Sequence, residues 1–234
     1  MIKEKKIVKR AIGVCFILAL SMLASAQSAG GKYVAICCNS YSDYQRGFAQ
    51  YEFPTLPPGS VEMVGQDGFT CGDILKMMPN IVPAQATHVE LYDTTNDAAA
   101  GTPTADLMSC IVQTIQELVQ RNRQVKIVVA LTAPWTSNNC SGDRRDLIDD
   151  YNSAFTGSNM GRRTGYEEYP GLAAMFPSNV TVVDVWTPNL GVQQDRYAAS
   201  FDMAGFCGVH PGPSEQWTWS WQHFTAPMTQ AVMQ

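Results

Sequence analysis

The most constraining feature of the sequence is an apolar run at residues 125–131 that directly follows a helical pattern at residues 104–122. The run is rich in β-branched residues, as is typical of a strand buried on both faces. In the segment before it, apolar residues recur at spacings of three and four, which indicates one face of an amphipathic helix. A helix that leads into a doubly buried strand favours a parallel sheet covered by helices on both faces.

The same alternation of strand and helix extends along the rest of the chain. Further strands are expected at residues 33–38, 60–64, 87–92 and 180–186, and further helices at residues 43–50, 73–78, 142–156, 165–175 and 213–233. We expect Pro79 to end the helix that begins at residue 73. The pattern predicts one α/β domain, a three-layer α/β/α sandwich with a mainly parallel five-stranded sheet. In such a sheet, active groups gather at the carboxyl ends of the strands.

The N-terminus has the pattern of a secretory signal peptide. Basic residues at positions 1–10 precede an apolar run at 11–23 and a small-x-small sequence that ends at Ala26. The run is too short for a comfortable membrane span, so we expect cleavage after Ala26. The mature domain would then span residues 27–234, without a membrane span, in an extracellular or periplasmic location. Cleavage lowers the net charge from −5 to about −9, and an acidic exported domain is a poor candidate for binding nucleic acid or anionic membranes.

Six cysteines follow the expected cleavage site, and an even number in an exported protein favours disulfide bonds. They are Cys37, Cys38, Cys71, Cys110, Cys140 and Cys207. The sequence contains no C-x-x-C pair and no Cys/His cluster with ligand spacing, so a metal site is not favoured. Six cysteines allow fifteen pairings, and the sequence does not choose among them.

One of the three histidines stands in a loop that glycine and proline residues restrict. His210 lies within residues 205–213, directly before the last expected helix. Imidazole titrates near neutral pH, so a histidine in this position is a candidate general base. Ser40, on the turn after the first expected strand, is a candidate nucleophile, and Ser42 competes with it. In a parallel sheet the serine and the histidine can meet at the carboxyl edge.

Acyl transfer to a serine also requires donors for the oxyanion of the tetrahedral intermediate. We expect the backbone N–H groups of Ser40 and Gly72 and the side-chain amide of Asn96 to supply them. These three residues follow the first, second and third expected strands, and Gly72 has no Cβ to obstruct the approach of the oxygen. The set predicts a serine site that uses no metal and no cofactor.

Four segments, in this order, resemble the four sequence blocks of the SGNH (GDSL-type) hydrolases. They are residues 38–43, 68–73, 94–97 and 207–211, which contain the serine, glycine, asparagine and histidine named above. The resemblance covers the whole mature chain. It implies a flavodoxin-like strand order and a secreted serine esterase that acts on small-molecule or carbohydrate esters. O-acetyl groups on carbohydrate are the first substrates to try, and lipid esters remain an option.

The chain departs from the family at the triad acid, because the position three residues before the histidine is Cys207. Three outcomes are compatible with this change. Asp202 could orient His210 from the same loop, a backbone carbonyl could hold the ring in a Ser–His dyad, or the site could be inactive. The last outcome corresponds to an alternative function, an SGNH-like domain that binds a glycan or a protein partner.

Two other blocks also differ from the family pattern. Cys38 and Asn39 stand where the family has Gly-Asp, and Thr94 stands where the third block has glycine. Because Cys38, Cys71 and Cys207 all lie beside the blocks, we expect a disulfide bond from Cys207 to either Cys71 or Cys38. A Cys207 side chain held in such a bond could not act as the triad acid.

Overall fold

The computed structural model describes residues 31–44, 52–92, 94–132, 144–158, 168–185 and 217–234. The fold is carried by one unit, Tyr33–Gln234. The expected signal peptide lies outside the described residues, so it stays a prediction. In the described part of the chain, every helix is either too short or too polar to cross a bilayer.

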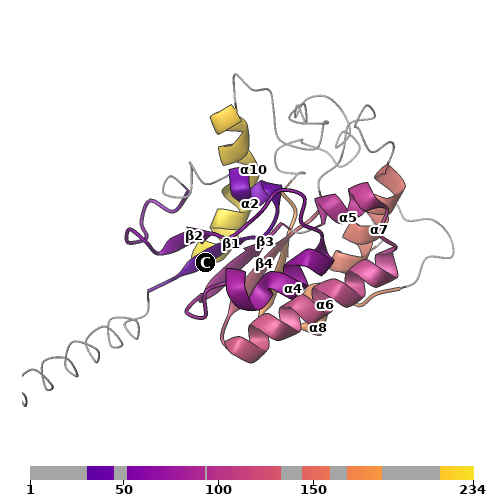
Figure 1. Ribbon diagram of the computed structural model, residues 1–234, viewed down its shortest axis with the longest axis horizontal. Helices are drawn as coiled ribbons and strands as arrows, with labels where there is room; N and C mark the ends of the chain where they lie inside the picture. Colours follow the sequence, from indigo (N-terminus) through magenta and orange to yellow (C-terminus); the bar gives the residue numbers. More distant parts are fainter. Residues whose placement is uncertain (1–30, 45–51, 93, 133–143, 159–167, 186–216) are drawn as a thin grey trace, which may run out of the picture. The chain divides into compact units, whose positions relative to one another are not determined.

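Five parallel strands form a single sheet, which confirms the predicted fold class. The strands are β1 (Val34–Cys37), β2 (Val61–Met63), β3 (His88–Leu91), β4 (Lys126–Ala130) and β5 (Val180–Val183). Their order is β2-β1-β3-β4-β5, and every neighbouring pair is parallel. This is the flavodoxin-like order (Figure 1). In β4, residues 127–130 are all buried, as the sequence predicted.

Helices cover both faces of the sheet. They are α2 (Ser40–Tyr44), α4 (Cys71–Ile81), α5 (Thr95–Ala100), α6 (Thr104–Arg121), α7 (Arg145–Thr156), α8 (Leu172–Met175) and α10 (Trp217–Met233). Helix α6 packs against α4 and α7, and α8 packs against α7 and β5. Helix α10 packs on β3, β4 and β5, on the side of the sheet opposite α4 and α6 (Figure 1). The predicted apolar face of α6 is confirmed, because Leu107, Ile111, Ile115 and Leu118 are buried.

Helix α4 begins earlier and ends later than the sequence predicted. Thr70 caps its start, because the Thr70 hydroxyl accepts from the Asp73 N–H while the Asp73 carboxylate accepts from the Thr70 N–H. The Thr70 hydroxyl also donates to the Asp73 carboxylate (2.7 Å), and this bond, followed by the one from the Thr70 N–H, holds the pKa of Asp73 below its ordinary value. The prediction that Pro79 ends the helix is wrong. Pro79 lies in the last turn, and Arg121 donates to the carbonyls of Met78 (3.1 Å) and Val82 (2.6 Å), which supports the helix end.

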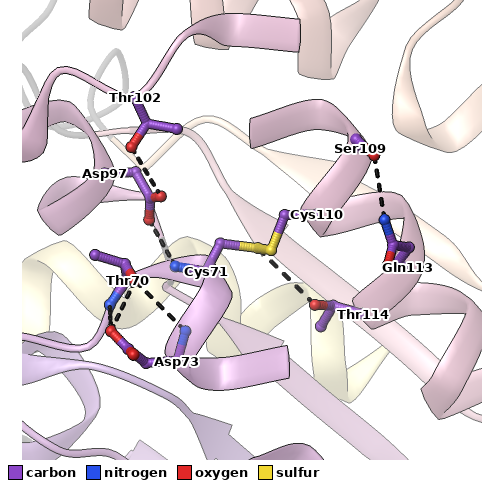
Figure 2. Close-up of a disulfide and its surroundings, with 9 residues drawn as sticks. All are labelled: Thr70, Cys71, Asp73, Asp97, Thr102, Ser109, Cys110, Gln113 and Thr114. Atoms are coloured by element: carbon purple, nitrogen blue, oxygen red, sulfur yellow. Dashed lines mark hydrogen bonds between the residues drawn. A yellow bond between two sulfur atoms is a disulfide. The ribbon is translucent and has the colours of Figure 1, made fainter. Parts of the chain in front are cut away.

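A disulfide bond between Cys71 and Cys110 joins the first turn of α4 to α6 (Figure 2). The expected bond from Cys207 to Cys71 is therefore wrong, and Cys207 itself lies outside the described residues. The sulfur atoms of adjacent Cys37 and Cys38 are in contact across a cis peptide bond. The Cys71–Cys110 pairing was not predictable from the sequence, because it depends on how α4 and α6 pack against each other in three dimensions.

Candidate active site

Ser40 is the first residue of α2, immediately beyond the carboxyl end of β1. Asn39 shapes this turn. Its side-chain oxygen accepts from the Tyr41 N–H (2.9 Å), and its carbonyl accepts from the N–H (3.1 Å) and the hydroxyl (2.8 Å) of Ser42. Ser42 is fully buried and its hydroxyl is used in holding the turn, whereas Ser40 retains 6% exposure. This arrangement favours Ser40 over Ser42 as the candidate nucleophile.

The segment after β2 lies directly against the Ser40 turn. The Gln66 N–H donates to the Cys38 carbonyl (3.2 Å). A Cβ placed on Gly65 would overlap the Ser42 hydroxyl and would stand 2.5 Å from the Asn39 carbonyl oxygen. Gly65 is therefore required by close approach to the turn, and the sequence did not indicate this role.

We expect Gly65→Ala to lower the free energy of unfolding by about 3 kcal/mol, because the new methyl group must displace backbone atoms of the Ser40 turn. Gly72→Ala is the matched control for stability, since a Cβ there would meet only Thr70 Oγ1, at 3.8 Å. Urea unfolding of the two variants beside the wild type measures the difference. Equal unfolding midpoints for both variants would show that Gly65 does not hold the turn.

The second and third sequence blocks are joined by direct hydrogen bonds. The Asn96 side-chain amide donates to the Phe69 carbonyl (2.7 Å), and the Asp97 carboxylate accepts from the Cys71 N–H (2.7 Å). Asp97 also accepts from the Thr102 hydroxyl (Figure 2). Burial raises the pKa of Asp97, and the bond from Cys71 partly offsets this rise. The turn that carries Asn96 is thus fixed against the start of α4.

Gly72 is the second residue of α4, so its N–H is one of the first-turn donors that have no acceptor within their own helix. Gly68 lies on the loop before the helix and has a φ of 79°, a conformation that favours glycine. It immediately precedes Phe69, whose carbonyl receives the Asn96 amide. Gly68 therefore shapes the loop that receives the Asn96 amide, a role that the sequence did not indicate.

A pair of tyrosines connects the Ser40 turn to the end of β3. The rings of Tyr41 and Tyr92 stack with centroids 6.2 Å apart and an angle of 7° between their planes. Burial raises the pKa of Tyr41, and a hydrogen bond with Thr95 opposes that rise. Thr95 directly precedes Asn96, so the Ser40 turn also contacts the third block. Ser40, Gly72 and Asn96 follow three adjacent strands at one edge of the sheet.

The threonine that replaces glycine in the third block has a partner. The Thr94 hydroxyl lies 2.6 Å from the Thr132 hydroxyl, and both side chains are buried. Asn152 of α7 holds the backbone of Thr132, accepting from its N–H (2.7 Å) and donating to its carbonyl (3.1 Å). The departure at residue 94 therefore adds a bond between the ends of β3 and β4.

His210 and Asp202 lie outside the described residues, as does Cys207. The structure therefore provides no geometry for the candidate base or for the candidate acid. The described residues include Ser40, Gly72 and Asn96, which follow three adjacent strands at the carboxyl edge of the sheet.

No family model matches this sequence, and no curated protein does either. Solved structures match it closely in fold. A GDSL-like lipase from Bacteroides thetaiotaomicron has a TM-score of 0.62 at 18% identity, covering 91% of this chain and 96% of that one. The lipase/acylhydrolase from Enterococcus faecalis has a TM-score of 0.62 at 12% identity, covering 86% and 95%.

A carbohydrate esterase of family 3 from Talaromyces cellulolyticus is also similar, with a TM-score of 0.53 at 15% identity, covering 86% of this chain and 97% of that chain. These similarities extend over nearly the full length of each solved structure. The chain therefore has the SGNH (GDSL-type) hydrolase fold, as the four sequence blocks implied.

Proposed function

We propose that the protein is a secreted serine esterase that hydrolyses carboxylic esters through Ser40. The observation that carries this proposal is the arrangement at the carboxyl edge of the sheet. There, the turn with Ser40 contacts the segment after β2 through Gly65 and the turn after β3 through the Tyr41–Thr95 bond. A nucleophile and oxyanion donors held against one another are what acyl transfer requires.

In this proposal the Ser40 oxygen attacks the ester carbon while His210 accepts the hydroxyl proton. The oxyanion is stabilised by backbone N–H groups and by Asn96. An amide nitrogen has two hydrogens, so Asn96 can keep its bond to the Phe69 carbonyl and donate the other hydrogen to the oxyanion. Collapse of the intermediate transfers the proton from His210 to the departing alcohol and leaves an acyl group on Ser40. Water, deprotonated by His210, then releases the acid.

The proposed substrates are small-molecule or carbohydrate esters, with acetyl esters first. The support is by analogy with fold neighbours, which include a carbohydrate esterase and an acetyl esterase studied with acetate. Because the neighbours also include lipases, esters with longer acyl chains are tested as well.

One observation favours a second candidate function. The triad acid position is Cys207, and a histidine without an orienting partner is a poor general base. A domain that has lost catalysis could keep the pocket for binding a glycan or a protein partner.

Hydrolysis of p-nitrophenyl acetate, butyrate and octanoate by the mature, oxidised protein tests the proposal. We expect turnover well above the uncatalysed rate, fastest with acetate. An Asp202→Asn variant measured beside the wild type separates a triad that uses Asp202 from a Ser–His dyad. Loss of activity in a folded variant would support Asp202 as the acid, and unchanged activity would support the dyad. Absence of turnover with every ester would favour the binding domain.

A further inference from the structure

Two glutamates are buried together beneath α10. Glu90 lies in the middle of β3 with no exposed surface, and Glu52 is 9% exposed. In the sheet, Glu90 is paired with Ile36 of β1 and with Val128 of β4, so apolar residues flank it on both neighbouring strands. One carboxylate oxygen of Glu90, Oε1, has no hydrogen-bond partner. Such burial of an acid is costly unless the group is neutral.

The surroundings of this pair supply hydroxyl groups and no cation among the described residues. From β3 the pair is faced by Tyr92, whose ring stacks on Tyr41 of α2, and from α10 it is faced by Thr225. His88 precedes Glu90 by two residues on the same strand face, and its ring is bonded to Thr87. In the part of α10 whose side chains are described, residues 225–233, all side chains are uncharged.

Burial is the main cause that raises the pKa of both acids. The pKa of Glu52 rises to about 7, with the Thr225 hydroxyl opposing the rise. The pKa of Glu90 rises well above its ordinary value, through burial and then through the nearby charge of Glu52. Acids with a raised folded pKa stabilise the fold fully only at low pH. Stability is lost as pH rises above the ordinary value near 4.5, through about 7.

A chain of contacts runs from Glu90 to the candidate nucleophile. The Tyr92 hydroxyl donates to Glu90 Oε2 at 3.4 Å. The Tyr92 ring stacks on Tyr41, and Tyr41 is the residue next to Ser40. Among the described residues, the Tyr92 hydroxyl is the one side-chain group bonded to Glu90. Ionisation of Glu90 therefore favours the entry of water or a shift of this tyrosine pair.

We propose that protonated Glu90 is a positioning residue for the Ser40 turn, acting through Tyr92 and Tyr41, and that ionisation of the Glu52–Glu90 pair loosens this turn. The inference deepens the proposed function and rests on it for the role of Ser40. The coupling of the acid pair to the turn is a property of the fold and can be measured without any ester.

The test compares the wild type with Glu90→Gln, which keeps the size of the side chain and removes the ionisation. Glu62→Gln, the same change on an exposed strand residue, is the matched control. Melting temperatures are measured from pH 5 to pH 9. Hydrogen exchange of residues 38–44 is followed by mass spectrometry at pH 6 and pH 8.5, corrected for the pH dependence of the exchange chemistry. Glu52→Gln is measured in parallel, in case Glu90→Gln does not fold.

We expect Glu90→Gln to melt like the wild type at pH 5 and at least about 4 °C higher at pH 8. Residues 38–44 of the wild type should lose at least about tenfold protection between pH 6 and pH 8.5, while the variant keeps its protection. Glu52→Gln should also melt above the wild type at pH 8.

Parallel melting profiles for the wild type and both variants would overturn the proposal. Equal protection of residues 38–44 in all proteins at pH 8.5 would also overturn it, because the acids would then affect stability without positioning Ser40. If the exchange results hold but no ester is hydrolysed, the proposed function fails while the coupling stands. If esters are hydrolysed, the decline of the rate at alkaline pH should shift to higher pH in Glu90→Gln.

Discussion

Ser40→Ala is expected to lower the rate of p-nitrophenyl acetate hydrolysis by at least about 10³-fold, because an acyl-enzyme cannot form without the nucleophile. The loss should appear in kcat rather than in KM, since removal of the hydroxyl takes away the nucleophile and leaves the surrounding side chains in place. The folded structure should be nearly unchanged, because the turn is held by Asn39 and Ser42.

Two controls belong with this variant. Ser109→Ala removes an exposed hydroxyl on α6 and should retain wild-type activity. Ser42→Ala should retain most of the activity while lowering the free energy of unfolding by about 1 kcal/mol, because it removes one buried hydrogen bond. If Ser42→Ala abolished hydrolysis and Ser40→Ala did not, the assignment of the nucleophile would be wrong.

Loss of the Cys71–Cys110 bond is expected to lower the free energy of unfolding by about 4 kcal/mol, the loop-closure value for a disulfide that spans 39 residues. The bond joins α4 to α6, and the Cys71 N–H donates a hydrogen bond to the Asp97 carboxylate. A double Cys71→Ala, Cys110→Ala variant should therefore unfold at a lower urea concentration.

Peptide mapping of the oxidised wild type should recover Cys71 and Cys110 in one linked fragment. A reducing agent that spares native structure should lower the unfolding midpoint of the wild type and have a smaller effect on the double variant, because the variant lacks this bond. Recovery of Cys71 linked to Cys207 would contradict the structure and restore the pairing first expected from the sequence.

The sheet and its order were accessible from the sequence because they depend on periodicity and on ordered motifs. Residues 127–130 read as a buried strand and are one. The extent of α4 was not accessible, since the pattern shows Pro79 but does not show that Arg121, from another helix, supports the carbonyls around it. Helix α5 is only six residues long and was not among the helices expected from the sequence.

The sequence predicted Ser40, Gly72 and Asn96 as site residues from their positions after successive strands, and their roles stay a prediction. It did not reveal Gly65, because a glycine required by close approach carries no local signal. Nor did it reveal Glu90, since a glutamate in a short strand gives no indication of whether its face is covered by α10. Both depend on contacts between segments that are distant in the sequence.

A fluorophosphonate probe reacts with an activated serine and so tests whether Ser40 is the nucleophile. The mature, oxidised protein is treated with the probe at pH 7, digested, and mapped by tandem mass spectrometry. We expect one modified residue, Ser40, no labelling of the Ser40→Ala variant, and no labelling of denatured protein. An unmodified Ser40 in folded protein, together with the absence of ester hydrolysis, would contradict the esterase and leave the binding domain as the better account.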